Sequence, residues 1–245
     1  MEERFFRFKC FANLSKFPKV IHGISNRAYG NMKFGWQPDE IVEKNRDYFF
    51  KELKIDKNQV IAPEIVHGAK ILSVGKAEKG KILKGTDGLI TREKDIFLLV
   101  TIADCLPILI YDPIVGAVAA VHAGWRSIVE QIVTLAIEKF KNFGSEPTNL
   151  IVAVGPGICQ KHFVVKKDVL SQFRELYPST IFLRNHDGYV DLKKAVAIDL
   201  RNAGVVGSNI EISTDCSVCQ NGIYGSFRKE GKSAPAGAAV IGMRG

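Results

Sequence analysis

The sequence predicts an α/β fold built from layers of sheet and helix. Apolar runs of strand length alternate with segments of helical periodicity, which is the pattern of a layered α/β protein. The chain has 245 residues, of which 46% are hydrophobic, so it can bury a sizeable core. The length alone allows one large or two small domains, but no segment has the composition of an interdomain linker.

The N-terminal half is predicted to contain mostly strands and one helix. The helix is expected from Asp39 to Leu53, where acidic residues fill the first turn and apolar residues recur at partial helical spacing. The segment from Val60 to His67 contains a proline, which favours an edge strand or an irregular strand. The other strands are expected at residues 4–12, 18–24, 96–102, 107–111 and 116–122, and the segment from Asp87 to Thr91 is expected to be a turn that enters a strand.

The C-terminal half is predicted to be richer in helices. Ser127 to Glu130 has the capping-box pattern, and apolar residues follow at helical spacing until Gly144. Two further amphipathic helices are expected, from Lys167 to Tyr177 and from Asp191 to Ala203. Strands are expected at residues 150–154, 209–213 and 238–243.

The charge of the chain limits its partners. A net charge of +8 suits an anionic ligand, but the positive charge is scattered and no motif indicates a specific nucleic-acid partner. No apolar run reaches the roughly 18 residues that span a membrane, and the first residues do not resemble a signal peptide. We therefore expect a cytoplasmic protein with no membrane partner. These patterns leave the oligomeric state open.

Three metal-capable side chains lie near the ends of apolar runs. Cys105 and His122 each follow a strand-like run, and His67 lies upstream, before a glycine. Two histidines and one cysteine can form the three-ligand set of a catalytic zinc, with a fourth position open. The alternative is structural: a lone histidine after a strand is often simply hydrogen-bonded, and an isolated cysteine often packs as a small apolar residue.

Two charged residues beside these side chains favour the functional interpretation. Asp104 stands in an otherwise apolar run, and a buried carboxylate needs a partner. It could orient a histidine ligand through the second ring nitrogen. Arg126 lies at a predicted helix start, where backbone N–H groups and a guanidinium can bind an anion.

The other cysteines carry a weaker signal. Cys216 and Cys219 form a Cys-x-x-Cys pair, which by itself is at most half of a structural zinc site. With no second pair or nearby histidine assigned to it, the pair is interpreted as structural cysteines. Five cysteines spread along the chain do not suggest a disulfide framework, and Cys10 and Cys159 receive no role.

Together these motifs resemble the bacterial YfiH-like family, also called the multicopper polyphenol oxidase or laccase-domain family. Its two central motifs, matched by residues 101–109 and 119–126, are highly specific in combination. The other matches are spread over nearly the whole chain: Arg27, Asn45-Arg46, Val66-His67-Gly68, Asp87 to Thr91, Gly155 to Ile158 with Phe163, Cys216, and Ser226-Phe227-Arg228.

The resemblance implies a fold, a metal and a reaction. The fold would be a single α/β domain over residues 1–245, with mixed β-sheet layers flanked by helices. His67, Cys105 and His122 would bind zinc. Members of the family are described as zinc-dependent purine nucleoside phosphorylases that act on adenosine, inosine and methylthioadenosine, with adenosine deamination as a side activity. A nucleoside and phosphate are then the expected partners.

The resemblance also suggests roles for single residues. Cys105, Asp104 and Arg46 are the catalytic candidates, and Asp104 would orient a group or transfer a proton. The substrate-binding candidates each carry a guanidinium that could hold phosphate near the ribose: Arg27, Arg46, Arg126 and Arg228.

The chain departs from the family pattern at several positions that we expect at the rim of the pocket. Ser127 replaces a glycine, residues 32–36 lack the Ser-Leu-Asn-Leu segment, and Ala234-Pro235-Ala236 replaces Thr-Gly-Arg. These changes are expected to affect substrate preference more than the metal site.

Two other functions remain as alternatives. A laccase needs many histidines in His-x-His pairs, and this chain has five histidines and no such pair. Cysteine and histidine can nevertheless bind copper, which would allow weak polyphenol oxidation. The second alternative is an amidase that removes a misincorporated amino acid from a peptidoglycan precursor, as some relatives are thought to do.

Overall fold

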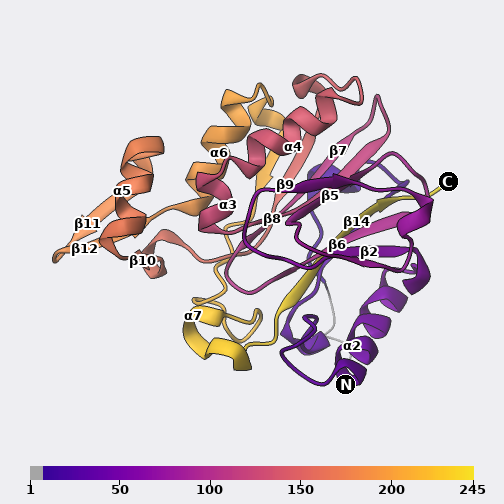
Figure 1. The fold of residues 1–245 in the computed structure, drawn as a ribbon, viewed down its shortest axis with the longest axis horizontal. Coiled ribbons are helices and arrows are strands. Elements are labelled where there is room, and N and C mark those ends of the chain that lie inside the picture. The colour runs from indigo at the N-terminus through magenta and orange to yellow at the C-terminus, as the bar shows by residue number, and fades with distance from the viewer. Residues whose placement is uncertain (1–7) are drawn as a thin grey trace.

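The computed structural model describes residues 8–245, and most of its strands form two large mixed sheets (Figure 1). Neighbouring strands in the five-stranded sheet follow the order β1 (Val20–Ile24), β14 (Gly237–Met243), β6 (Ile96–Ile102), β2 (Val60–Pro63) and β4 (Ile82–Leu83). The six-stranded sheet has the order β13 (Ile210–Ile212), β9 (Ile151–Val154), β7 (Leu106–Asp112), β8 (Ala117–Ala123), β5 (Gly88–Thr91) and β3 (Ile71–Ser73).

The two sheets pack face to face around a shared apolar core. Alternation along β6 sends Leu98 and Val100 towards the six-stranded sheet, where they join Val118 and Ala120 of β8 in one buried cluster. Every residue of β6 and β8 is buried, since both faces of each sheet are covered. The long apolar runs in the sequence follow from this double burial.

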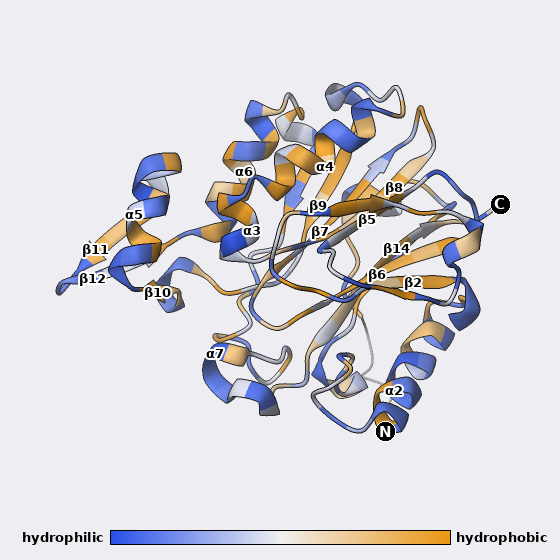
Figure 2. Cartoon of the chain, in the orientation of Figure 1, coloured by the Kyte–Doolittle hydropathy of each residue, from blue (hydrophilic) through white to orange (hydrophobic). Residues whose placement is uncertain are grey.

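Helices cover the two outer faces, which gives four layers. The helix α2 (Asp39–Glu52) packs against the five-stranded sheet, where Phe49 and Leu99 share a second buried cluster. The opposite face of the molecule carries α3 (Trp125–Val129), α4 (Ile132–Lys141) and α6 (Leu192–Asn202). Figure 2 shows the hydrophobic strands enclosed between helices with hydrophilic outer surfaces. The predicted layered α/β fold is confirmed.

A small substructure extends from one side of these layers (Figure 1). Its three strands have the order β10 (Val164–Val165), β12 (Asp187–Val190) and β11 (Ile181–Arg184), and α5 (Lys167–Leu176) packs on them. Two α-helices of a single turn also occur, α1 (Ala12–Ser15) and α7 (Phe227–Glu230). None of the helices found between residues 8 and 245 is long and apolar enough to cross a membrane.

Three predicted elements differ from the structure. The strand expected over 60–67 ends at Pro63, because the residues that follow leave the sheet as a loop. The helix expected after a capping box at Ser127 to Glu130 begins earlier, at Trp125, with Gly124 as its N-cap and no side-chain cap, so the capping-box prediction is wrong. It is also two helices, because Gln131 adopts a left-handed conformation with φ of 63°. The strand expected over 4–12 lies partly outside the described residues, and within them only Lys9 forms a bridge before α1 begins at Ala12.

Candidate metal centre and substrate cavity

Strand ends bring the three predicted metal ligands together. The antiparallel strands β7 and β8 pair Pro107 with His122, so Cys105, two residues before Pro107, lies at the same edge of the sheet as His122. His67 comes from the loop between β2 and β3. The candidate ligand atoms of His67, Cys105 and His122 all lie within 4.8 Å of one another, as the prediction requires.

The fully buried carboxylate of Asp87 holds both histidines. Its Oδ1 accepts a hydrogen bond from the backbone N–H of His67 (2.7 Å) and lies 3.1 Å from Nδ1 of His122. Its Oδ2 accepts from the N–H of Gly68 (2.9 Å). These bonds hold His67 at its left-handed φ of 62° and leave Nε2 of His122 as the ring nitrogen that faces Cys105 and could bind a metal.

Asp104, expected to orient a histidine, has different partners. Its Oδ1 accepts from the hydroxyls of Ser217 (2.6 Å) and Ser226 (2.7 Å), and its Oδ2 accepts from the backbone N–H of Arg228 (2.6 Å). Asp104 therefore attaches the C-terminal loop to the turn that carries Cys105. The histidine-orienting carboxylate is Asp87, which the sequence signalled only as a charged residue directly before a buried apolar strand.

The electrostatics of the cluster favour a thiolate at Cys105 and a protonated ring at His122. Burial would raise the pKa of the Cys105 thiol, but the charge of His122 and hydrogen bonds from His122 and His67 outweigh it and lower the pKa to about 6. Burial would lower the pKa of His122, but the Cys105 thiolate and Asp87 raise it to about 9. A thiolate is the form of cysteine that binds metals, so Cys105 is ready near neutral pH, whereas a metal ion would displace the proton from His122.

The donor set fits zinc. A thiolate and two imidazoles are ligands that zinc accepts, and three protein ligands are the usual number at a catalytic site. The rings of His67 and His122 are nearly perpendicular, with centroids 4.9 Å apart, so they do not stack against each other. The fourth coordination position would be available to a ligand in the adjoining cavity.

A cavity of about 380 Å³ adjoins this cluster, within the range of about 300–1,000 Å³ usual for small-molecule sites. His67, Cys105 and His122 line it together with aromatic and cationic side chains. The ring centroids of Trp36 and Phe227, which both line the cavity, lie 5.8 Å apart. The guanidinium of Arg126 lies 4.2 Å from the Trp125 ring centroid. The charged residues of the lining are Lys33, Asp104, Arg126 and Arg228.

The four predicted substrate-binding arginines divide into two pairs. Arg126 and Arg228 line the cavity, whereas Arg27 and Arg46 do not. Arg27 forms an ion pair with Glu230 (2.8 Å). The Nε of Arg46 donates to the backbone oxygen of Met32 (2.9 Å), and burial lowers the pKa of Arg46 to about 10. Both guanidinium groups have partners within the protein and lie outside this cavity.

Some of the departures from the family pattern lie at the cavity, and one does not. Ser127 is fully buried in α3 and does not line the cavity, so the expectation that it lies at the rim is wrong. The segment of residues 32–36 contributes Lys33 and Trp36 to the lining, and the replaced C-terminal motif contributes Ala236. These two segments, where the chain departs from the family pattern, therefore form part of the cavity wall.

Comparison with known proteins identifies the family. Residues 17–244 match the family described as multi-copper polyphenol oxidoreductase laccase. The chain belongs to this family. Over 91% of its length it is 27% identical to the purine nucleoside phosphorylase YlmD of Bacillus subtilis, covering 85% of that protein. Over 74% it is 31% identical to adenosine deaminase RL5 of an unknown prokaryotic organism, covering 73% of that protein.

Solved structures agree with this assignment. The crystal structure of YlmD from Geobacillus stearothermophilus superposes with a TM-score of 0.92 and 26% identity, covering 100% of this chain and 98% of that one. The YfiH protein of Bacillus licheniformis has the same fold, with a TM-score of 0.90. The predicted membership of the YfiH and laccase-domain family is confirmed, and the named relatives support an enzyme.

Proposed function

We propose that this chain is a zinc-dependent purine nucleoside phosphorylase acting on adenosine, inosine and methylthioadenosine. The observation that carries the proposal is the cluster of His67, Cys105 and His122 at the wall of a cavity lined by both cationic and aromatic side chains. A phosphorylase must hold an anion and a purine side by side, and the lining offers a surface for each. The names of several relatives support the same reaction.

The aromatic side chains would hold the purine. Trp36 and Phe227 present rings at the cavity, and the ammonium group of Lys33 lies 4.9 Å from the Trp36 ring centroid, within range of a cation–π interaction. Stacking of a base on an aromatic side chain is worth about 1–3 kcal/mol. Stacking alone does not distinguish adenine from hypoxanthine, which agrees with a proposed range of purine substrates.

The cations would hold phosphate. Arg126 can bind two phosphate oxygens through its planar guanidinium. Lys33, from the segment of residues 32–36, adds a second positive charge to the cavity lining. Holding the nucleophile beside the ribose lowers the entropic part of the barrier. Zinc, bound by His67, Cys105 and His122, would supply a Lewis acid that stabilises negative charge.

The direct test supplies purified protein with inosine and phosphate and follows the release of hypoxanthine. We expect release that depends on phosphate, and a rise of at least tenfold in the phosphate KM for Arg126→Gln, since a charge-assisted hydrogen bond is worth about 1.5–3 kcal/mol. Arg201→Gln, on the exposed side of α6, is the matched control. Phosphate-independent release, or an unchanged phosphate KM in Arg126→Gln, would contradict the proposal.

Adenosine deamination is a second candidate, favoured by the 31% identity to adenosine deaminase RL5. It would release ammonia from adenosine in the absence of phosphate, so the two activities separate in one assay series. Multicopper oxidation has less support, because neither cluster of metal-capable residues found within 8–245 contains more than two histidines. Metal analysis of protein purified without added copper distinguishes zinc from copper.

A further inference from the structure

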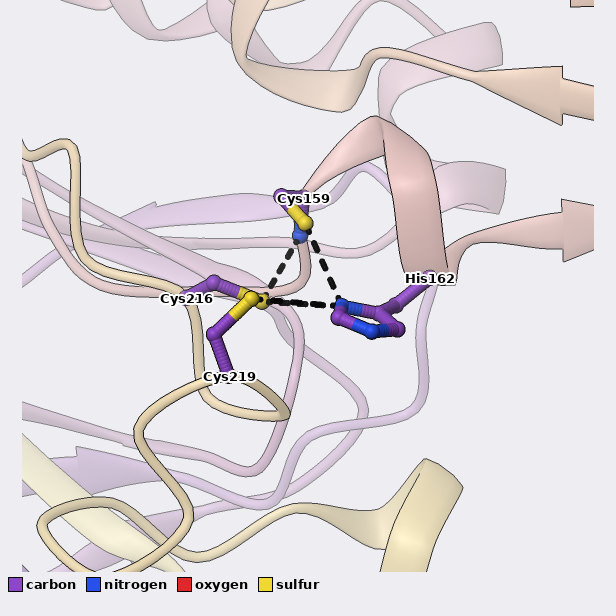
Figure 3. Close-up of side chains that lie close together, drawn as sticks. All are labelled: Cys159, His162, Cys216 and Cys219. Carbon is purple, nitrogen blue, oxygen red and sulfur yellow. Dashed lines mark hydrogen bonds between the residues drawn. The ribbon is translucent and has the colours of Figure 1, made fainter.

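A second cluster of metal-capable side chains lies outside the candidate catalytic centre. Cys159 and His162 come from the loop after β9, and Cys216 and Cys219 come from the loop after β13. Figure 3 shows the four side chains pointing towards one another from these two loops. Their candidate ligand atoms all lie within 4.8 Å of one another, and the three cysteines are free thiols.

We propose that Cys159, His162, Cys216 and Cys219 bind a structural zinc ion. The distances from Nδ1 of His162 to the three sulfurs are 3.4, 3.7 and 3.5 Å. A zinc tetrahedron with zinc–sulfur bonds of about 2.3 Å and a zinc–nitrogen bond of about 2.0–2.1 Å has sulfur–nitrogen edges of about 3.6 Å. The three observed sulfur–nitrogen distances match these edges to within about 0.2 Å.

The ligand set is that of a closed, structural site. Three thiolates and one imidazole fill all four positions of tetrahedral zinc, whereas a catalytic site keeps one position open. Each loop supplies its two ligands three positions apart, as Cys-x-x-His and Cys-x-x-Cys. This spacing lets one tight turn place both ligands on the same ion, and it recurs in zinc-binding folds.

The backbone around the cluster is arranged to support it. Gly157 and Cys216 form a bridge between the two loops, and the N–H of Ser217 donates to the oxygen of Gly157 (3.3 Å). The N–H of Cys159 donates to the sulfur of Cys216 (3.3 Å), which would stabilise negative charge on that sulfur. The loops therefore meet through backbone contacts before any ion binds.

A nearby cation would balance the charge. Zinc with three thiolates carries a net charge of −1, which is unfavourable in a partly buried place without a counter-ion. The ammonium group of Lys193 donates to the backbone oxygens of Ser213 (2.7 Å) and Asp215 (2.6 Å), directly before Cys216. Lys193 thus brings one positive charge beside the cluster.

The proposed ion would fix one wall of the substrate cavity. Ile158 and Phe163 line that cavity and flank the first pair of ligands in sequence. In the second loop, Ser217 lies between the other two ligands and donates to Asp104 beside Cys105. Zinc would join the two loops without taking part in the reaction, so its role differs from that of the first centre.

The test counts zinc per chain in protein purified without added metal. We expect two ions in the wild type, one in Cys105→Ser, and one in Cys159→Ser/Cys219→Ser, which removes one ligand from each loop. Cys10→Ser changes an exposed cysteine outside both clusters and should retain both ions. The double variant should also have a lower Tm and faster proteolysis in the loop after β13.

A second measurement leaves all four proposed ligands unchanged, so it does not depend on the folding of a variant that lacks them. Cobalt added to the metal-free Cys105→Ser/His122→Ala protein should bind once per chain and give the strong visible and thiolate charge-transfer bands of tetrahedral sulfur coordination. Absence of these bands, or a single zinc in the wild type that Cys105→Ser removes completely, would overturn the proposal. A disulfide among the three cysteines in the freshly purified protein would overturn it as well.

Discussion

Asp87→Asn is the most informative perturbation of the candidate catalytic centre. The carboxylate accepts from the backbone of His67 and Gly68 and from Nδ1 of His122, so it positions two of the three ligands. The amide keeps the size of the side chain but offers one acceptor oxygen instead of two. Its NH₂ group must then face either the N–H of Gly68 or the protonated ring nitrogen of His122.

The expected loss of zinc affinity in Asp87→Asn can be estimated in two ways. Loss of one hydrogen bond to a charged acceptor costs about 1.5–3 kcal/mol. Loss of the partner that orients a metal-binding histidine typically lowers metal affinity by about 10–100-fold. At about 1.4 kcal/mol for each factor of ten, that range equals about 1.4–2.8 kcal/mol, so the two routes agree. We therefore expect zinc affinity at the first centre to fall by one to two orders of magnitude.

The assay is a competition titration of the metal-free protein with a chromophoric zinc chelator. Asp112→Asn is the matched control because Asp112 is also fully buried but lies at the end of β7 farther from Cys105. Its Oδ1 accepts hydrogen bonds from the N–H groups of Ile114 (2.7 Å) and Val115 (3.1 Å). An asparagine can keep both bonds, and zinc affinity should not change. A folded Asp87→Asn protein that binds zinc as tightly as the wild type would refute the reasoning.

Two further predictions concern packing and pH. Gly124→Ala would place a Cβ 3.2 Å from the sulfur of Cys105 and 3.3 Å from Cδ2 of His67, so we expect weaker zinc binding by chelator titration. Gly207→Ala meets no atom within 4 Å and should bind zinc normally; equal affinities would contradict this account. Burial raises the pKa of Asp199 to about 6 from its ordinary 3.8, so the folded state favours the protonated form. Wild-type stability relative to Asp199→Asn should be greatest below about pH 4, fall by up to about 3 kcal/mol as the pH rises through 6, and then level off. Urea unfolding of both proteins across this pH range measures the difference in their free energies of unfolding. A difference that does not change with pH would contradict the raised pKa of Asp199.

The sequence was informative where local pattern decides structure. Cys105 and His122 follow buried strands, and consecutive antiparallel strands return such residues to one edge of a sheet, so their proximity was predictable. The break at Gln131 was not, since no glycine or proline marks it. There the side chain bonds to the hydroxyl of Tyr177, a residue 46 positions away.

The two carboxylates show why roles are harder to predict than places. Asp87 and Asp104 both stand beside apolar strands, and both are hydrogen-bonded as the pattern required. Which of them faces His122 depends on the pairing of β5 with β8, which puts Asp87 next to His122 in the sheet. Strand order does not follow from periodicity, so the sequence does not show that Asp87 and not Asp104 orients His122.

The second cluster was missed for a different reason. The Cys-x-x-Cys pair alone predicts no closed metal site, although Cys159 and His162 have the same spacing 57 positions earlier. A Cys-x-x-His pair is common by chance, and only the parallel contact between Gly157 and Cys216 shows that the two turns meet. The shared spacing of three positions is the one signal in the sequence that connects the two pairs.

The most direct test of zinc-dependent phosphorolysis measures hypoxanthine and ribose 1-phosphate formed from inosine and phosphate while zinc is returned to the metal-free protein. We predict equal amounts of both products, a rate that rises with zinc until the first centre is filled, and no recovery in His122→Ala. Full activity in His122→Ala, or activity that the metal-free protein shows without zinc, would contradict the central claim.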